Sequence, residues 1–169
     1  MKTIETERTI LRPFTLNDAP AVLEFNSNPE VIKYTGDILF TSLEQTIAMM
    51  NSVTFKDYET HGYGRYAVVY KADNKVIGFC GLKYLPEHDE TDIGYRFLPE
   101  YWGKGIASET AEAIVEFGLI ELGLKRIIGV AEPNNIASCK VLEKIGLTYY
   151  KTDRYAEGED DTYWYKIER

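Results

Sequence analysis

A short glycine-rich segment is the first stretch whose residue types point to chemistry. It reads Gly103-Lys104-Gly105-Ile106-Ala107 and precedes a long amphipathic run. No Ser, Thr, Asp or Asn stands where a helix N-cap normally stands, so the first N–H groups of the predicted helix lack a side-chain partner. Small residues let a ligand approach the main chain, and free N–H groups at a helix start bind anions. The segment therefore predicts a diphosphate site, with an ordinary glycine-containing loop as the alternative.

Four stretches of the chain resemble one protein family. Residues 101–109 resemble the acetyl-CoA pyrophosphate loop of the GNAT acetyltransferase superfamily, and more narrowly the branch of ribosomal-protein-alanine N-acetyltransferases. The further matches, in the family's order, are residues 6–13 with Asp18, residues 28–31 with Tyr34, and residues 135–138 with 142–147. Together they extend from about Arg8 to Leu147. Four ordered matches are far more specific than one glycine motif.

This resemblance implies a fold and a cosubstrate. The fold would be α+β, with a splayed mixed sheet of about seven strands and helices on both faces. The family binds acetyl-CoA where the sheet opens at its parallel pair, which would place residues 103–107 on the diphosphate. The pantetheine arm would pair with strand backbone near Phe97 and Leu98. The activity implied is that of an N-acetyltransferase, in which an amine attacks the thioester carbonyl.

Such a reaction needs a base for the amine, and two acidic residues are candidates. Asp92 begins the central strand on the same side as Gly94 and Arg96, at a position where relatives often carry a carboxylate acting through water. Glu90 lies on the same side and is the alternative. A base that operates near neutral pH would need a pKa raised by partial burial. Both residues could instead be surface acids of a turn.

The departing thiolate needs a proton or a hydrogen bond, and the last predicted helix supplies a candidate. Many superfamily members use a Tyr there, but the resemblance places that position at Leu142, so this chain departs from the pattern. In the ribosomal-protein branch, a Ser at the position of Ser138 is the candidate near the sulfur. Asn135 shares its helix face and would bind a pantetheine amide or cap the helix. Lys140 and Lys144 could reach the 3′-phosphate or form a solvated face.

The composition limits the classes of partner. The 169 residues suffice for one domain, residues 1–169. A formal net charge of −8 argues against a nucleic-acid partner and suits a cationic amine, although it also favours solubility. We expect a cytoplasmic protein without a membrane partner, because no apolar run could span a bilayer and residues 1–5 lack a signal-peptide core. Cys80 and Cys139 should be reduced thiols, and no metal site is expected. A homodimer stays open.

Local periodicity predicts the elements that must position these residues. Alternating patterns predict strands at residues 6–14, 65–70, 75–85, 93–98, 125–131, 147–155 and 161–167. Helical patterns predict helices near residues 15–26, 30–33, 42–61, 106–122 and 134–145. The strand at 125–131 is apolar on both faces, which favours a parallel strand joined to the one at 93–98 by a right-handed crossover.

The acceptor could be a protein N-terminus or a small amine such as a polyamine, antibiotic or amino acid. A degenerate member that binds acyl-CoA without turnover is the alternative outside the enzymes. We expect the acceptor to enter between the first helices and the C-terminal hairpin. The hairpin aromatics, which could equally be cross-strand pairs, are Tyr149, Tyr150, Tyr155, Tyr163, Trp164 and Tyr165. The helix residues that could line this cleft or fill the core are Tyr34, Met49, Met50, Phe55 and Tyr58.

Overall fold

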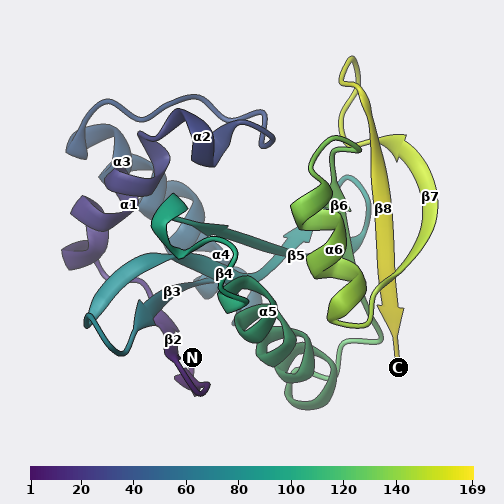
Figure 1. The fold of residues 1–169 in the computed structure, drawn as a ribbon, viewed down its shortest axis with the longest axis horizontal. Helices are drawn as coiled ribbons and strands as arrows, with labels where there is room; N and C mark the ends of the chain where they lie inside the picture. Colours follow the sequence, from purple (N-terminus) through teal and green to yellow (C-terminus); the bar gives the residue numbers. More distant parts are fainter.

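Apolar and β-branched runs build eight strands that join in one sheet in the computed structural model, which describes residues 1–169 (Figure 1). The strands are β1 Ile4–Glu5, β2 Thr9–Pro13, β3 Arg65–Tyr70, β4 Lys75–Leu85, β5 Glu90–Phe97, β6 Arg126–Ala131, β7 Thr148–Arg154 and β8 Asp161–Glu168. Their order is β1-β2-β3-β4-β5-β6-β8-β7, and only β5 and β6 are parallel neighbours. The predicted α+β fold with a mixed sheet is confirmed. The eighth strand, β1, is too short to give a periodic pattern.

The prediction of one strand over residues 6–14 is wrong at its start. The chain forms β1 and β2 with a turn between them, and Glu5 pairs with Ile10. The Thr6 N–H donates to the Thr9 carbonyl at 2.9 Å, and Thr6 Oγ1 accepts from the Thr9 N–H at 3.0 Å. Threonine hydroxyls that bond nearby main chain compete with strand pairing, which explains the interruption.

The helices agree with the predicted pattern. They are α1 Ala19–Asn26, α2 Pro29–Ile32, α3 Leu43–Met49, α4 Phe55–His61, α5 Ile106–Glu116 and α6 Ile136–Lys144. A π-helical turn over Met50–Thr54 joins α3 to α4, so the predicted helix at 42–61 is one helical run, and a second such turn over Phe117–Glu121 extends α5. None of the helices combines the length and the apolar character of a membrane span.

Adjacent residues of β4 show that helices cover both faces of the sheet. The Phe79 ring packs on Phe25 of α1, with ring centroids 6.1 Å apart. The next residue, Cys80, is fully buried and points to the opposite face, where α5 packs on β4. Burial raises the pKa of the Cys80 thiol to about 12. Cys139 is half-buried, and neither Cys80 nor Cys139 takes part in a disulfide.

The sheet opens between β5 and β6. These strands pair only through Asp92 and Ile128, and they diverge beyond this pair. Figure 1 shows the resulting halves, with β2–β5 and α1–α5 on one side and β6–β8 with α6 on the other. Main-chain polar groups that lack a strand partner are available to a ligand. The opening therefore lies where the parallel pair was expected to splay.

Candidate active site

The glycine-rich segment forms the connection from β5 to α5. A 3₁₀ turn spans Pro99–Tyr101, and α5 begins at Ile106. Gly103 and Gly105 have φ values of +70° and +76°, the left-handed region that favours glycine. Gly105 occupies the N-cap position, and no side chain caps the helix, as the sequence predicted. A Cβ placed on Gly103 would meet no atom within 4 Å. Open space beside uncapped N–H groups fits a diphosphate.

The main chain just before this loop offers fewer free groups than expected. The Leu98 N–H donates to the Ile77 carbonyl at 2.9 Å, and the Leu98 carbonyl accepts from the Tyr101 N–H at 3.0 Å. The Phe97 carbonyl accepts from Trp102 Nε1 at 2.7 Å. Trp102 is 48% exposed, so this hydrogen bond lies at the surface. A carbonyl oxygen can accept two hydrogen bonds, so the Phe97 and Leu98 carbonyls could still pair with a pantetheine arm, whereas the Leu98 N–H is already used.

Asp92 lies at the point where the two parallel strands separate, because it is the β5 residue paired with Ile128. Its carboxylate is buried and accepts from Arg65 Nη2 at 2.9 Å. Burial raises the pKa of the Asp92 carboxyl, and Arg65 opposes this only in part by stabilising the charged form. The alternative of a surface acid in a turn is therefore wrong for Asp92.

Arg65 of β3 contacts the candidate base Asp92, a contact that was not predicted from the sequence. Its Nη1 donates to the Gly81 carbonyl at 2.6 Å, and its guanidinium carbon lies 5.5 Å from the centre of the Phe79 ring. The side chain reaches Asp92 by crossing Gly94, where a Cβ would lie 2.2 Å from Arg65 Nη1. A glycine inside a strand often marks such a close approach, so Gly94 was the available signal.

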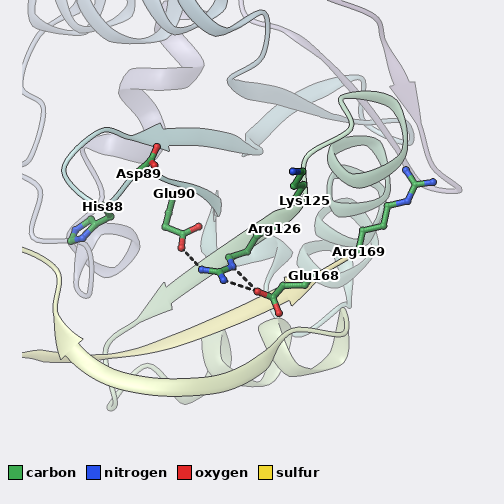
Figure 2. A pocket seen from close by; sticks show the side chains of 7 residues that line it. All are labelled: His88, Asp89, Glu90, Lys125, Arg126, Glu168 and Arg169. Carbon is green, nitrogen blue, oxygen red and sulfur yellow. Dashed lines mark hydrogen bonds and ion pairs between the residues drawn. The ribbon is translucent and has the colours of Figure 1, made fainter.

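Glu90 faces different surroundings from Asp92, although both lie on one side of β5. Its carboxylate accepts from Arg126 Nη1 at 2.6 Å, and Arg126 Nε also donates to Glu168 at 2.7 Å (Figure 2). An open cavity of about 620 Å³ is lined here by His88, Asp89, Glu90, Lys125, Arg126, Glu168 and Arg169. No group of three or more His, Cys, Asp or Glu side chains is arranged to hold a metal ion. A base role for Glu90 would require its ion pair to break.

Asn135 and Ser138 begin α6. Asn135 is the N-cap residue, and its Oδ1 accepts from the Ser138 N–H at 3.2 Å. The capping alternative therefore holds for the amide oxygen, while the amide nitrogen stays available as a donor. Ser138 Oγ lies 2.9 Å from Tyr95 Oη, which also donates to the Ser138 carbonyl at 3.1 Å. Lys140 and Lys144 are exposed.

Tyr95 likewise contacts the candidate Ser138, a contact that was not predicted from the sequence. Strand alternation places it on the face of β5 opposite to Asp92, from which its phenol reaches α6. Burial raises the pKa of Tyr95, and the charge of Asp92 adds to the shift, so the phenol remains a neutral donor. The structure thus brings Tyr95, Ser138 and Asn135 together and joins Asp92 to Arg65. Residue order alone cannot give the distance between β5 and α6.

Two of the helix residues expected near the acceptor are held by the rest of the fold, Met50 by burial in the core and Tyr58 by hydrogen bonds. Met50 is 1% exposed. The Tyr58 hydroxyl accepts from the Phe14 N–H at 3.1 Å and donates to the Arg65 carbonyl. Met50 therefore follows the core-filling alternative, whereas Tyr58 is only partly buried and connects the helical run 43–61 to β3.

Most aromatic residues of the C-terminal hairpin contact one another or the neighbouring turn. Trp164 and Tyr165 are buried. The Tyr149 ring makes edge contacts with Tyr163 and Tyr165, at centroid distances of 5.6 and 5.9 Å. His88 packs edge-on against Trp164 at 4.8 Å. The Tyr149 contacts support the cross-strand alternative, because Tyr149 pairs with Tyr165 across the hairpin.

Comparison with known proteins identifies the family. The model of the acetyltransferase (GNAT) domain matches residues 8–148. The uncharacterized N-acetyltransferase YoaA of Bacillus subtilis (strain 168) is 37% identical over 144 residues, which cover 85% of this chain and 81% of that protein. The crystal structure of a GNAT-family acetyltransferase from Bacillus anthracis is 32% identical, with a TM-score of 0.83 over 99% of this chain and 98% of that one.

More distant matches differ in their named acceptors. Spermidine N(1)-acetyltransferase of Escherichia coli (strain K12) is 22% identical over 139 residues, which cover 82% of this chain and 72% of that protein. The structure of RimL, a ribosomal L7/L12 alpha-N-protein acetyltransferase in complex with coenzyme A, shares the fold at a TM-score of 0.83 and 20% identity, over 99% of this chain and 98% of that one. The names thus include a polyamine and a protein acceptor. The family model, the relatives named N-acetyltransferases and the shared fold together show that this chain belongs to the GNAT acetyltransferase family and is an N-acetyltransferase.

Proposed function

We propose that this chain transfers an acetyl group from acetyl-CoA to a primary amine. The observation that carries the proposal is the uncapped start of α5 at Gly105, with open space beside Gly103. In the proposed complex, main-chain N–H groups of residues 103–107 hold the diphosphate. The net charge of −8 supports a cationic acceptor.

The opening between β5 and β6 would receive the pantetheine arm. Phe97 supplies a main-chain carbonyl at this open edge, which can accept a second hydrogen bond beside the one from Trp102 Nε1. The free amide nitrogen of Asn135 donates to a carbonyl of the arm from the other side. The thioester then lies near the Asp92–Ile128 pair, where the strands converge.

Asp92 and Ser138 would divide the proton chemistry. Asp92 takes a proton from the acceptor ammonium, directly or through water, and its raised pKa brings it closer to neutral pH. The amine nitrogen attacks the carbonyl carbon, the C–S bond breaks, and the sulfur gains a proton. Ser138 Oγ hydrogen-bonds the sulfur as its charge develops, and Tyr95 orients Ser138. The products are an amide, the CoA thiol and one proton released to solvent.

The acceptor class divides into two candidates. The resemblance to the ribosomal-protein branch favours a protein N-terminus. The relative named spermidine N(1)-acetyltransferase supports a polyamine as the second candidate.

A screen for thiol release tests the proposal directly. Acetyl-CoA is incubated with N-terminal peptides, spermidine, aminoglycosides and amino acids, and mass spectrometry identifies the acetylated product. We expect at least one amine to release thiol well above the rate of hydrolysis. Tight CoA binding by calorimetry without turnover of any amine would instead identify a binding module and contradict the proposal.

A further inference from the structure

Arg8, which lies outside the glycine-rich loop, forms a hydrogen bond to the main chain of that loop. This residue lies in the turn between β1 and β2. Its Nη1 donates to the Lys104 carbonyl at 2.7 Å, and its Nε donates to Glu109 Oε2 at 2.6 Å. The Arg8 main-chain N–H donates to Glu109 Oε1 at 2.8 Å. One residue, distant in the sequence, therefore binds the loop just before Gly105 and the first turn of α5 just after it.

The contact with Lys104 determines where the next N–H points. In a planar trans peptide the carbonyl and the following N–H point in opposite directions. Because the Lys104 carbonyl is turned toward Arg8, the Gly105 N–H points away from Arg8. A Cβ on Gly105 would lie 3.6 Å from Arg8 Nη2, so Arg8 also covers one side of this residue. The free N–H is thus presented on the side that Arg8 leaves open.

We propose that Arg8 is a positioning residue for the diphosphate site, an inference that rests on the proposed acetyl-CoA-dependent function. Arg8 fixes the Lys104–Gly105 peptide so that its N–H is aimed at the diphosphate before the ligand arrives. A pre-oriented donor binds more tightly because no ordering is needed on binding.

Arg8 also keeps a carboxylate from competing for the same site. Glu109 lies in the first turn of α5, where a free carboxylate could bond the uncapped N–H groups or repel a diphosphate. Thr6 Oγ1 donates to Glu109 Oε1 at 2.6 Å, and the two Arg8 donors engage both carboxylate oxygens. Burial raises the pKa of Glu109, but these hydrogen bonds outweigh it and the net pKa is lowered. The carboxylate stays charged and bound to the β1–β2 turn.

The test replaces Arg8 by lysine, which keeps the charge but lacks the planar fork that reaches Lys104 and Glu109 together. We expect Arg8→Lys to raise the Kd for CoA about tenfold, the scale of one charge-assisted hydrogen bond. The KM for acetyl-CoA should rise similarly, with kcat within about twofold of the parent. The affinity for dephospho-CoA should fall by the same factor in Arg8→Lys, because the effect acts on the diphosphate and not on the 3′-phosphate.

Arg12→Lys is the matched control. Arg12 lies in β2 and makes a two-pronged ion pair with Asp18, both contacts at 2.8 Å, so this variant disrupts a similar pair outside the proposed diphosphate site. Its Kd for CoA should stay within about twofold of the parent.

Three results would overturn the inference. The first is parental CoA affinity in Arg8→Lys. The second is a loss of kcat and melting temperature with KM unchanged, which marks a purely structural role. The third is that Arg8→Lys binds CoA more weakly than the parent does but binds dephospho-CoA with parental affinity. Failure of the proposed function is distinguishable, because CoA calorimetry needs no acceptor: a parent that binds CoA through Arg8 but acetylates no amine contradicts only the proposed function.

Discussion

At the scale of single residues, Asp92 combines burial with one guanidinium partner. Asp92→Asn keeps the size of the side chain but removes the proton acceptor, so kcat/KM should fall by about 100- to 10,000-fold, the range of a general base. A base works only when deprotonated, and burial raises the pKa of Asp92. Parental kcat/KM should therefore decrease as pH falls through that raised pKa, and the variant should lack this decrease. Steady-state rates measured against pH check both expectations.

Asp92→Asn also breaks an ion pair with Arg65, and Asp18→Asn is the control for that loss. Asp18 forms a similar ion pair with Arg12, away from the opening between β5 and β6. The kcat/KM of Asp18→Asn should stay close to the parental value. A rate for Asp92→Asn within about threefold of the parent across the pH range would exclude a general base. Catalysis would then rest on holding the amine and the thioester together.

Ser138 should act only as the sulfur gains charge. Ser138→Ala should lower kcat about tenfold and leave the Kd for CoA nearly unchanged, because the lost interaction is made mainly in the transition state. Tyr95→Phe should change kcat in the same direction by less, since Tyr95 acts through Ser138. Single-turnover rates and CoA calorimetry separate the two quantities. Weaker CoA binding with unchanged kcat would assign Ser138 to ground-state binding.

At the scale of elements, the loop before α5 depends on glycine geometry, and the chain offers a matched pair. Gly103 and Gly62 have φ values of +70° and +73°, and a Cβ on either would meet no atom within 4 Å. Each Gly→Ala variant should lose about 1 kcal/mol of stability from the left-handed backbone. Only Gly103→Ala should bind CoA more weakly, by about tenfold, if the open space receives the diphosphate. Equal CoA affinity in the two variants, measured by calorimetry, would place the site elsewhere.

The elements were largely predictable from sequence because their signals are local. The alternation in β4 and β5, the apolar face of α5 and the missing N-cap at Gly105 are all readable over a few residues. The Arg65–Asp92 and Tyr95–Ser138 contacts were not, because strand register and helix placement bring these residues together. The β1–β2 turn was missed for a related reason: Thr6 bonds the main chain of Thr9 where the pattern alternates as a strand does.

At the scale of the whole molecule, acid stability should depend on the Asp18 carboxylate. Burial raises its pKa, but hydrogen bonds from Arg12 and Thr15 outweigh this and lower the net pKa. A lowered folded-state pKa gives stability that is present above the unfolded-state pKa and is lost as pH falls through the folded-state value. Asp18→Asn should therefore lower the free energy of unfolding by about 1 to 3 kcal/mol at neutral pH. Denaturant unfolding at several pH values should show this difference shrinking in acid, and a difference independent of pH would contradict the assignment.

Only one residue pair joins β5 to β6, and this should affect how readily the enzyme misassembles in a cell. Each half-sheet carries an incompletely paired strand edge, and such edges are templates for pairing with another chain. In the proposed complex, the cosubstrate covers these edges and binds only the folded state, so it stabilises the protein by mass action. Bound acetyl-CoA would then protect the folded enzyme from pairing with other chains. The protein would be most prone to misassembly when the acetyl donor is scarce.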